Sequence, residues 1–311
     1  MCANWFSGQT GFTIHLKNLR TGDDMGKIAV FNTSEYLSTL AVNALVDEVC
    51  LTPKPGLVDE ENNGSHHDLT LSMMKASARS LYPFFVEMAQ AAKDKQPSQS
   101  LRETLGEIGR KAEEKMFAVT NGINTHKGAI WSLGLLIGSV ASRRNSTSEE
   151  IAKRAGEIAR FEDAFMIKRL TNGTRVKKKY GVNGAAGEAK AGFPHIIKFV
   201  LPMLRETKNI NHSRLNALMA VMAHLDDTCI LHRGGTLASE KVKEGARAVL
   251  RNGGVGTREG FQSLLKLNSL VEALFVSPGG SADLLAAGLF LYELEKRGIG
   301  GNSDGNTSLR L

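Results

Sequence analysis

Residues 35–50 read EYLSTLAVNALVDEVC, and the apolar side chains of this stretch recur at the spacing of one helix face. The residues on that face are Leu37, Leu40, Ala41, Ala44, Leu45 and Val49. The segment therefore predicts an amphipathic helix. The same period recurs through most of the following chain without a convincing strand, so the sequence predicts an all-α fold.

Nine further segments carry the helical pattern, at 68–92, 101–118, 125–141, 149–170, 187–206, 213–231, 235–252, 258–276 and 281–296. Thr125 and Ser281 are candidate N-caps, and Gly253 with Gly254 is a stop signal. Pro202 predicts a kink because proline lacks the backbone N–H. No regular repeat is present, which excludes a solenoid. We expect a single globular bundle of about ten helices, with the active site built from interhelical loops.

The two ends of the chain differ from its middle. Residues 1–34 show no helical period, with only a short strand pattern at 12–16, and are interpreted as an N-terminal extension. No linker divides residues 35–298, which we interpret as one all-α catalytic domain. Residues 299–311 are rich in glycine and serine and are expected to form a flexible tail.

The chain carries a formal net charge of +7, which favours anionic partners. Much of the excess lies in one stretch that contains Lys168, Arg169, Arg175, Lys177, Lys178 and Lys179. This stretch could be a solvated basic loop or a loop that steers phosphate groups. Nucleic-acid binding is disfavoured, because Tyr180 is the only stacking aromatic residue beside it.

The cysteine content and the length of the apolar runs indicate in which cellular compartment the protein is expected. Cys2, Cys50 and Cys229 are too few and too scattered for a disulfide framework or a CxxC metal site, and they fit a reducing cytoplasm. The most apolar run, 128–141, is shorter than the roughly 20 residues of a membrane span. We expect a soluble, cytoplasmic protein with no membrane or nucleic-acid partner.

Five glycine-punctuated polar motifs interrupt the helical pattern. They are TPKPGLVD (52–59), GSHHDL (64–69), NTHKG (124–128), DDTCILHRGG (226–235) and SPGGSADLL (277–285). Each joins a polar or charged side chain to a backbone that a ligand can approach closely. Together they predict one polyphosphate site assembled from segments that are distant in the sequence.

Two of these motifs display a lysine at a helix end or turn. Pro53 and Pro55 stiffen the turn around Lys54, although a plain helix-ending turn would look the same. Lys127 follows Asn124 and Thr125 in the first turn of a helix, where free N–H groups already favour an anion. We therefore expect phosphate at Lys127.

The DDTCILHRGG motif predicts a metal. Asp226 and Asp227 follow an apolar helix, and carboxylates near a helix C-terminus are electrostatically unfavourable. A cation would offset that cost, and Mg²⁺ that bridges phosphates normally uses one or two carboxylates. Arg233, a few residues further on, can hold a phosphate with two donors.

The five motifs resemble those of the triphosphoribosyl-dephospho-CoA synthase family, over about residues 35–285. Gly64, His66, Asp68 and Asp227 match the family pattern, whereas Thr70 stands where relatives carry an aspartate. The resemblance implies transfer of the 5-triphosphoribosyl unit of ATP to the 2′-hydroxyl of 3′-dephospho-CoA, with release of adenine. The product would be the prosthetic-group precursor of citrate lyase or malonate decarboxylase.

The resemblance also implies roles for individual residues. Asp68 is the first candidate for the catalytic base or the oxocarbenium stabiliser, Glu188 is the second, and Asp227, with Asp226, would bind Mg²⁺ as cofactor. The implied substrate-binding residues are Lys54, His66, Asn124, Thr125, His126, Lys127, His232, Arg233, Gly279, Gly280 and Ser281. ATP and dephospho-CoA would be the substrates, the product would pass to a transferase acting on an acyl carrier protein, and a homodimer is expected.

Two other function classes remain open from the residues. His67 and Asp68 could serve an all-α metal-dependent phosphohydrolase of the HD type, but that class needs another upstream histidine, and only His15 precedes the motif. A non-enzymatic RNA-binding helical protein would rest on the basic stretch alone. Release of adenine from ATP separates the transferase from both.

Overall fold

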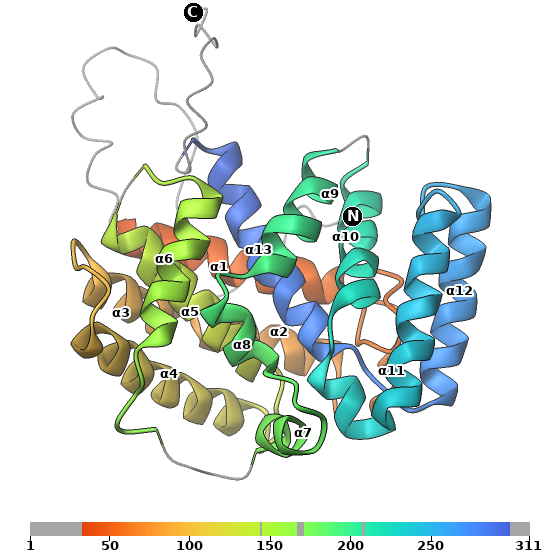
Figure 1. Ribbon diagram of the computed structural model, residues 1–311, viewed down its shortest axis with the longest axis horizontal. Helices are drawn as coiled ribbons and strands as arrows, with labels where there is room; N and C mark the ends of the chain where they lie inside the picture. Colours follow the sequence, from red (N-terminus) through yellow and green to blue (C-terminus); the bar gives the residue numbers. More distant parts are fainter. Residues whose placement is uncertain (1–32, 144, 167–170, 207–208, 299–311) are drawn as a thin grey trace, which may run out of the picture.

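Two helices that are apolar on almost every face, α5 (Lys127–Ser142) and α13 (Gly279–Lys296), lie at the centre of the molecule (Figure 1). Leu133 and Leu136 on α5, and Leu285 and Phe290 on α13, are completely buried. A helix that is apolar all round needs neighbours on every side. The other helices supply these neighbours and share one hydrophobic core with the central pair.

The structure is a computed structural model and describes residues 33–143, 145–166, 171–206 and 209–298. Those residues are helical with no strand, which confirms the all-α prediction. The strand pattern at 12–16, the proposed extension and the proposed tail lie outside the described residues. The first helix begins at Thr33, two residues before the predicted start of the domain.

The remaining helices pack on the central pair or on one another. They are α1 (Thr33–Cys50), α2 (Leu71–Ser80), α3 (Tyr82–Ala92), α4 (Gln99–Val119), α6 (Ser148–Arg160), α7 (Asn172–Tyr180), α8 (Gly184–Lys190), α9 (Leu201–Arg205), α10 (Ile210–His224), α11 (Thr228–Arg251) and α12 (Arg258–Ala273). α5 packs against α3, α4 and α6, whereas α13 packs against α1 and α10. α11 and α12 form a hairpin at one edge of the molecule (Figure 1).

Two of the predicted helices are divided, one near Pro83 and the other at Gly192 and Phe193, where φ is positive. The predicted helix 68–92 begins only at Leu71 and breaks at Leu81, because Pro83 starts α3 and cannot donate to the preceding turn. The predicted helix 187–206 becomes α8, a π-helical turn (Ile196–Val200) and α9. In that turn the Leu201 N–H reaches back five residues to Ile196. The kink predicted at Pro202 stays a prediction; the structure shows a π-helical turn directly before this proline.

Two further boundaries differ from the prediction. The helix expected over 149–170 ends at Arg160, and the loop that follows is fixed to α4 by Asp163. The Asp163 carboxylate accepts a hydrogen bond from Arg110 at 2.6 Å and lies 3.5 Å from Arg102. The helix expected over 213–231 ends at His224, so most of DDTCILHRGG lies on α11, which bends at Gly235 where φ is +69°.

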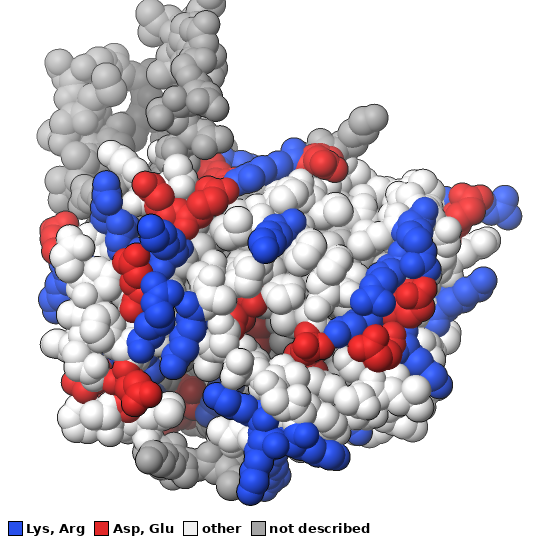
Figure 2. Space-filling model, viewed as in Figure 1, with Lys and Arg blue, Asp and Glu red and all other residues white. Residues whose placement is uncertain are grey.

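Four of the six residues of the basic stretch lie on a helix rather than on the expected loop. α7 carries Arg175 and Lys177 to Lys179 on its exposed face, and Figure 2 shows basic side chains gathered over it. None of these four cations pairs with a carboxylate among the described residues. Lys168 and Arg169 lie outside the described residues. α7 packs against α11.

No helix in the described ranges is both long enough and apolar enough to cross a membrane.

Candidate active site

The five polar motifs meet where helix ends from α1, α5, α11 and α13 come together. Ser65 donates its N–H to the Gly56 carbonyl, which joins TPKPGLVD to GSHHDL. Arg233 donates to the Ser65 carbonyl at 3.3 Å, and this hydrogen bond connects DDTCILHRGG to GSHHDL. Asp227 accepts from Ser281, which adds SPGGSADLL. The NTHKG motif is joined through Asp283, as described below.

Asp227 lies at the start of α11 and caps it. Its Oδ1 accepts the N–H of Cys229 at 2.9 Å, and its Oδ2 accepts both the N–H and the hydroxyl of Ser281, at 2.8 and 2.9 Å. The Gly280 N–H donates to Oδ1 at 3.3 Å. Burial raises the pKa of Asp227 although these hydrogen bonds act in the opposite direction. The expectation that Asp227 is destabilised by a helix C-terminus is therefore wrong, because the carboxylate faces two helix N-termini.

The predicted magnesium ligands do not fit a resident metal in this arrangement. Each oxygen of Asp227 already accepts two hydrogen bonds, and Asp226 pairs with Lys243 on α11. Among the residues that the structure describes, no group of three or more His, Cys, Asp or Glu side chains is placed to hold a metal ion. A requirement for Mg²⁺ stays a prediction.

The amides of SPGGSADLL are engaged by the protein itself. α13 begins at Gly279 rather than at Ser281, so Ser281 lies inside the first turn and is not the N-cap. The N–H groups of Gly280 and Ser281 both point to Asp227. The anion at this helix end is therefore a side chain of the chain, and the predicted contact of these amides with phosphate is untested.

Asp283 is the residue of this site that the sequence did not single out. It lies just after the first turn of α13 and faces the start of α5, where the Ala129 N–H donates to its carboxylate. A Cβ on Gly128 would lie 2.0 Å from Asp283 Oδ2, so only glycine permits this approach. Burial, and after it the charges of Glu48 and Asp227, raise the pKa of Asp283 well above its usual range. Asp283 as a residue is of intermediate exposure, and burial of its carboxyl is the main cause of the raised pKa.

Lys54 is buried rather than displayed. Its Nζ donates to Glu48 Oε1 and to the Glu48 carbonyl, both at 2.6 Å, and the residue is 3% exposed. The pair joins the loop after α1 back to α1. The expectation that Lys54 projects from a rigid turn toward phosphate is therefore not met, because its ammonium is covered and paired with Glu48.

His126 is also internal. Its Nδ1 lies 2.9 Å from Ser77 Oγ, which in turn lies 2.6 Å from Thr125 Oγ1. Burial, followed by the charge of Lys54, lowers the pKa of His126 to about 3, so the ring is neutral. Its Nε2 is buried without a hydrogen-bond partner. Thr125 is not the N-cap of α5. The N-cap is His126, and the Oδ1 of Asn124 accepts the Lys127 N–H at 3.2 Å.

Lys127 and Arg233 provide accessible positive charge at this site. Lys127 Nζ pairs with Glu113 Oε2 at 2.6 Å, and its side chain remains 40% exposed. Arg233 is exposed and donates to His66 Nδ1 at 3.3 Å as well as to the Ser65 carbonyl. His232, its neighbour on α11, is also exposed. These groups can contact an anionic substrate without unfolding any part of the core.

His66 connects Arg233 to the loop before α13. Its Nε2 lies 2.9 Å from Ser277 Oγ. Burial, followed by the charge of Arg233, lowers the pKa of His66 to about 4. The neutral ring therefore accepts from Arg233 through Nδ1 and donates to Ser277 through Nε2. Asp68, whose side chain is 60% exposed, lies 3.7 Å from His66 Nδ1 at the rim of the site.

Glu188 holds a turn together. Its Oε1 accepts the His195 N–H at 2.8 Å, and its Oε2 lies 2.7 Å from His195 Nδ1. The carboxylate is buried in the link between α8 and the π-helical turn. α8 itself starts beside α11, where Gly184 lies against Thr228. A catalytic role for Glu188 stays untested.

A half-buried carboxyl with a raised pKa, set among buried charges at converging helix ends, is typical of an enzyme site. The chain belongs to the family described as ATP:dephospho-CoA triphosphoribosyl transferase, whose model matches residues 34–300. This confirms the family predicted from the motifs and the prediction that the chain is a transferase. No finding favours the phosphohydrolase or the RNA-binding alternative.

Several relatives share nearly half of their residues with this chain and are named "Probable 2-(5′′-triphosphoribosyl)-3′-dephosphocoenzyme-A synthase". The relative from Azotobacter vinelandii is 47% identical over 269 residues, which cover 84% of this chain and 92% of the relative. One from Pseudomonas fluorescens is 45% identical and covers 86% of this chain and 94% of the relative. A crystal structure from Archaeoglobus fulgidus covers 71% of this chain and 98% of that one, with 21% identity and a TM-score of 0.49.

Proposed function

We propose that this chain transfers the 5-triphosphoribosyl unit of ATP to the 2′-hydroxyl of 3′-dephospho-CoA and releases adenine. The family match over residues 34–300 carries this proposal. The bond between C1′ of the ATP ribose and N9 of adenine breaks, and a bond from the acceptor 2′-oxygen to C1′ forms. The hydroxyl proton must leave, and adenine departs with the electron pair of the broken bond and takes up a proton. Such a reaction needs a base and groups that hold the triphosphate.

Asp283 is the best-placed base. It lies between α13 and the start of α5, is of intermediate exposure as a residue, and is oriented by the Ala129 N–H. A carboxylate whose pKa is raised toward the working pH is a stronger base while it can still be deprotonated. Asp68 is more exposed, and both oxygens of Glu188 are engaged by His195, so these two residues are weaker candidates.

The triphosphate is proposed to lie against the exposed cations, with Arg233, His232 and Lys127 as its contacts. Arg233 can present two donors to one phosphate group. The unpaired cations of α7, which packs on α11, would draw anions toward this side. Mg²⁺ is proposed to arrive with the triphosphate, where it would neutralise charge, rather than to be held by Asp226 and Asp227.

The fate of the product, the cellular compartment and the oligomeric state are also proposals. The product would pass to a transferase that acts on an acyl carrier protein, in the cytoplasm. A homodimer is supported by the α11–α12 hairpin, which exposes Leu237, Phe261, Leu265 and nearby Phe275. Large exposed apolar side chains are often found in protein contacts.

Incubation of the protein with ATP, MgCl₂ and 3′-dephospho-CoA tests the proposed function. We expect free adenine in an amount equal to that of a new product heavier than dephospho-CoA by one triphosphoribosyl unit, both detected by chromatography with mass spectrometry. Omission of dephospho-CoA is the control, and adenine release should then cease or become slow. ADP or phosphate in place of adenine would contradict the proposal and favour a phosphohydrolase.

Lys127→Ala is expected to weaken ATP binding by about 1.5–3 kcal/mol, the usual contribution of a charge-assisted hydrogen bond. The stability of the free protein should change by less than about 1 kcal/mol, because Lys127 is partly exposed and opposes the positive end of α5. Titration calorimetry with ATP and urea denaturation of the free protein measure the two quantities.

Two variants serve as controls for Lys127. Glu113→Gln removes the partner of Lys127 and should leave ATP affinity unchanged or raised. Lys54→Ala leaves Glu48 buried without its partner and should lower the free energy of unfolding by about 3–5 kcal/mol. A Lys127→Ala protein that melts early and binds ATP normally would show that Lys127 is structural.

A further inference from the structure

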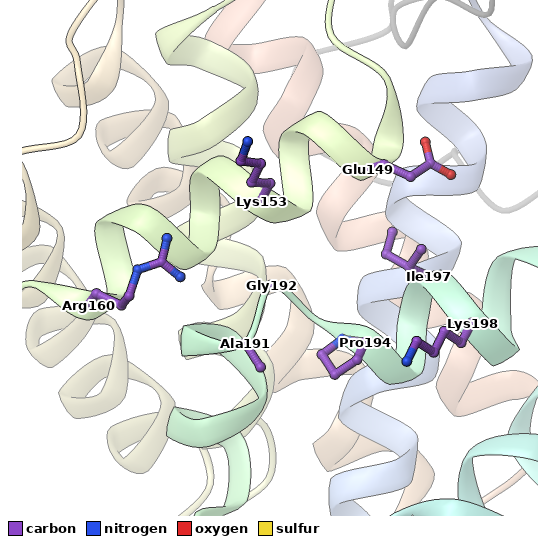
Figure 3. A pocket seen from close by; sticks show the side chains of 8 residues that line it. All are labelled: Glu149, Lys153, Arg160, Ala191, Gly192, Pro194, Ile197 and Lys198. Carbon is purple, nitrogen blue, oxygen red and sulfur yellow. The ribbon is translucent and has the colours of Figure 1, made fainter.

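A groove of about 340 Å³ lies between α6 and the turn that links α8 to the π-helical turn (Figure 3). Lys153 and Arg160 project from α6 on one side, and Lys198 lies on the opposite side. Ala191, Pro194 and Ile197 give the groove an apolar floor. No predicted site residue lines it, so it is distinct from the meeting point of the five motifs.

The floor of the groove is held firmly. Gly156 on α6 lies so close to the turn that a Cβ there would be 3.0 Å from the Ala189 carbonyl oxygen and 3.1 Å from the Gly192 nitrogen. Beneath the turn, Phe193 is completely buried and donates its N–H to the Glu188 carbonyl. A ligand would therefore meet a preformed surface, which lowers the entropy lost on binding.

The charges of the groove are mostly uncompensated. Neither Lys153 nor Lys198 pairs with a carboxylate in the described ranges, and the hydrogen bond of Arg160 goes to the Lys190 carbonyl. The one acidic group of the lining, Glu149, lies 3.6 Å from Arg205. A concave surface with three cations and one already paired carboxylate favours an anion.

The groove and the active site lie at opposite ends of one short helix. α8 begins at Gly184 beside Thr228, the first residue of α11, and ends at Lys190 beside the groove. Seven helical residues span about 10 Å. A ligand that reaches both places must be long, with a reactive group at one end and an anionic part further along.

We propose that this groove binds the diphosphate and the pantetheine arm of 3′-dephospho-CoA, which deepens the proposed function and rests on it. The acceptor continues from its 2′-hydroxyl through a ribose to a diphosphate and then to a long neutral arm. The cations of the rim match the diphosphate, and the apolar floor matches the arm. The triphosphate of ATP has no apolar extension and has its own cations at the other end of α8.

The double variant Lys153→Ala/Lys198→Ala tests this inference. The KM for dephospho-CoA should rise roughly tenfold, which corresponds to about 1.4 kcal/mol, while kcat and the KM for ATP stay within about twofold of the wild type. The matched control is Lys241→Ala/Lys266→Ala on the α11–α12 hairpin, where both lysines are exposed and lack a carboxylate partner among described residues. It removes the same charge and should leave all three parameters unchanged.

Ile197→Asn tests the apolar floor. This variant should weaken binding of dephospho-CoA and leave binding of ADP unchanged, because ADP carries the same adenosine diphosphate without the arm. Titration calorimetry with both ligands measures this, and a thermal melt verifies folding. If Ile197→Asn does not fold, the lysine variant, which changes exposed residues of the rim, still decides the question.

The outcomes separate the groove from the proposed function. Unchanged dephospho-CoA affinity in the double variant overturns the inference, and so does a rise in the KM for ATP alone, which would assign the groove to the triphosphate. If the wild type releases no adenine, the proposed function fails. In that case, loss of calorimetric dephospho-CoA binding in the double variant, but not in its control, would still support the groove.

Discussion

Asp283→Asn lowers kcat by a factor of roughly 10² to 10⁴, the usual contribution of a general base, if Asp283 takes the proton of the acceptor hydroxyl. The free energy of unfolding of this variant at neutral pH should be higher than that of the wild type. Both effects have one cause, because the partly buried carboxylate lies near Glu48 and Asp227. In this proposal the negative charge of Asp283 is needed for proton abstraction, and the same charge lowers the free energy of unfolding.

The pH dependence gives the sign of the stability effect. The pKa of Asp283 in the folded protein is raised above the value of about 3.9 in the unfolded chain. Below about pH 4 the carboxyl is protonated in both states and costs nothing. As the pH rises from there to the folded pKa, the unfolded chain loses its proton first, so the wild type loses stability relative to Asp283→Asn.

Urea denaturation at pH values from 4 to 8 and initial rates of adenine release measure these two effects. The gain in stability of Asp283→Asn should be absent near pH 4 and largest at neutral pH. Asp68→Asn is the matched control, because its side chain is exposed and its loss should change neither stability nor kcat strongly. An Asp283→Asn protein with normal kcat and reduced stability would identify Asp283 as a structural cap, and a large loss of kcat in Asp68→Asn would restore Asp68 as the base.

Asp227→Ala should lower the free energy of unfolding by about 3–5 kcal/mol. The carboxylate accepts three backbone N–H groups and one hydroxyl from the first turns of α11 and α13. Its removal leaves buried donors without a partner, which costs more than the loss of an exposed hydrogen bond. Circular dichroism in urea gives the change in stability.

Two variants show whether the effect comes from these hydrogen bonds. Ser281→Ala removes one of the four donors and should cost about 1 kcal/mol. Asp226→Ala breaks a partly exposed pair with Lys243 and should cost less than about 1 kcal/mol. An Asp227→Ala protein with wild-type stability and altered Mg²⁺ dependence would instead support the magnesium site predicted from the sequence.

The helices and the convergence of the motifs were accessible from the sequence. Helical periodicity reports which face of a segment is buried, so α1, α4, α5, α12 and α13 were predicted with nearly correct bounds. Helix divisions were predicted less well, because Pro83 and the π-helical turn before Pro202 depend on how the backbone restores its hydrogen bonds.

The tertiary contacts of individual side chains could not be predicted from the sequence. Glu48 falls within a helical pattern that gives no sign of Lys54, and Asp283 shows no link to Gly128 until α13 and α5 are packed together. The same limit explains the misplacement of Asp227. A sequence shows that a carboxylate lies between two helices, but only the tertiary structure shows which helix N-termini it faces.

The bend of α11 at Gly235 has a mechanical consequence. The first turns of that helix carry Arg233 to the active site, and the rest of it forms the outer hairpin with α12. Because helices resist bending, a protein that binds to the hairpin and moves it would change the backbone mainly at Gly235. Arg233 lies two residues before that hinge and donates to the Ser65 carbonyl, so a movement of the outer hairpin would reach the candidate active site through this side chain.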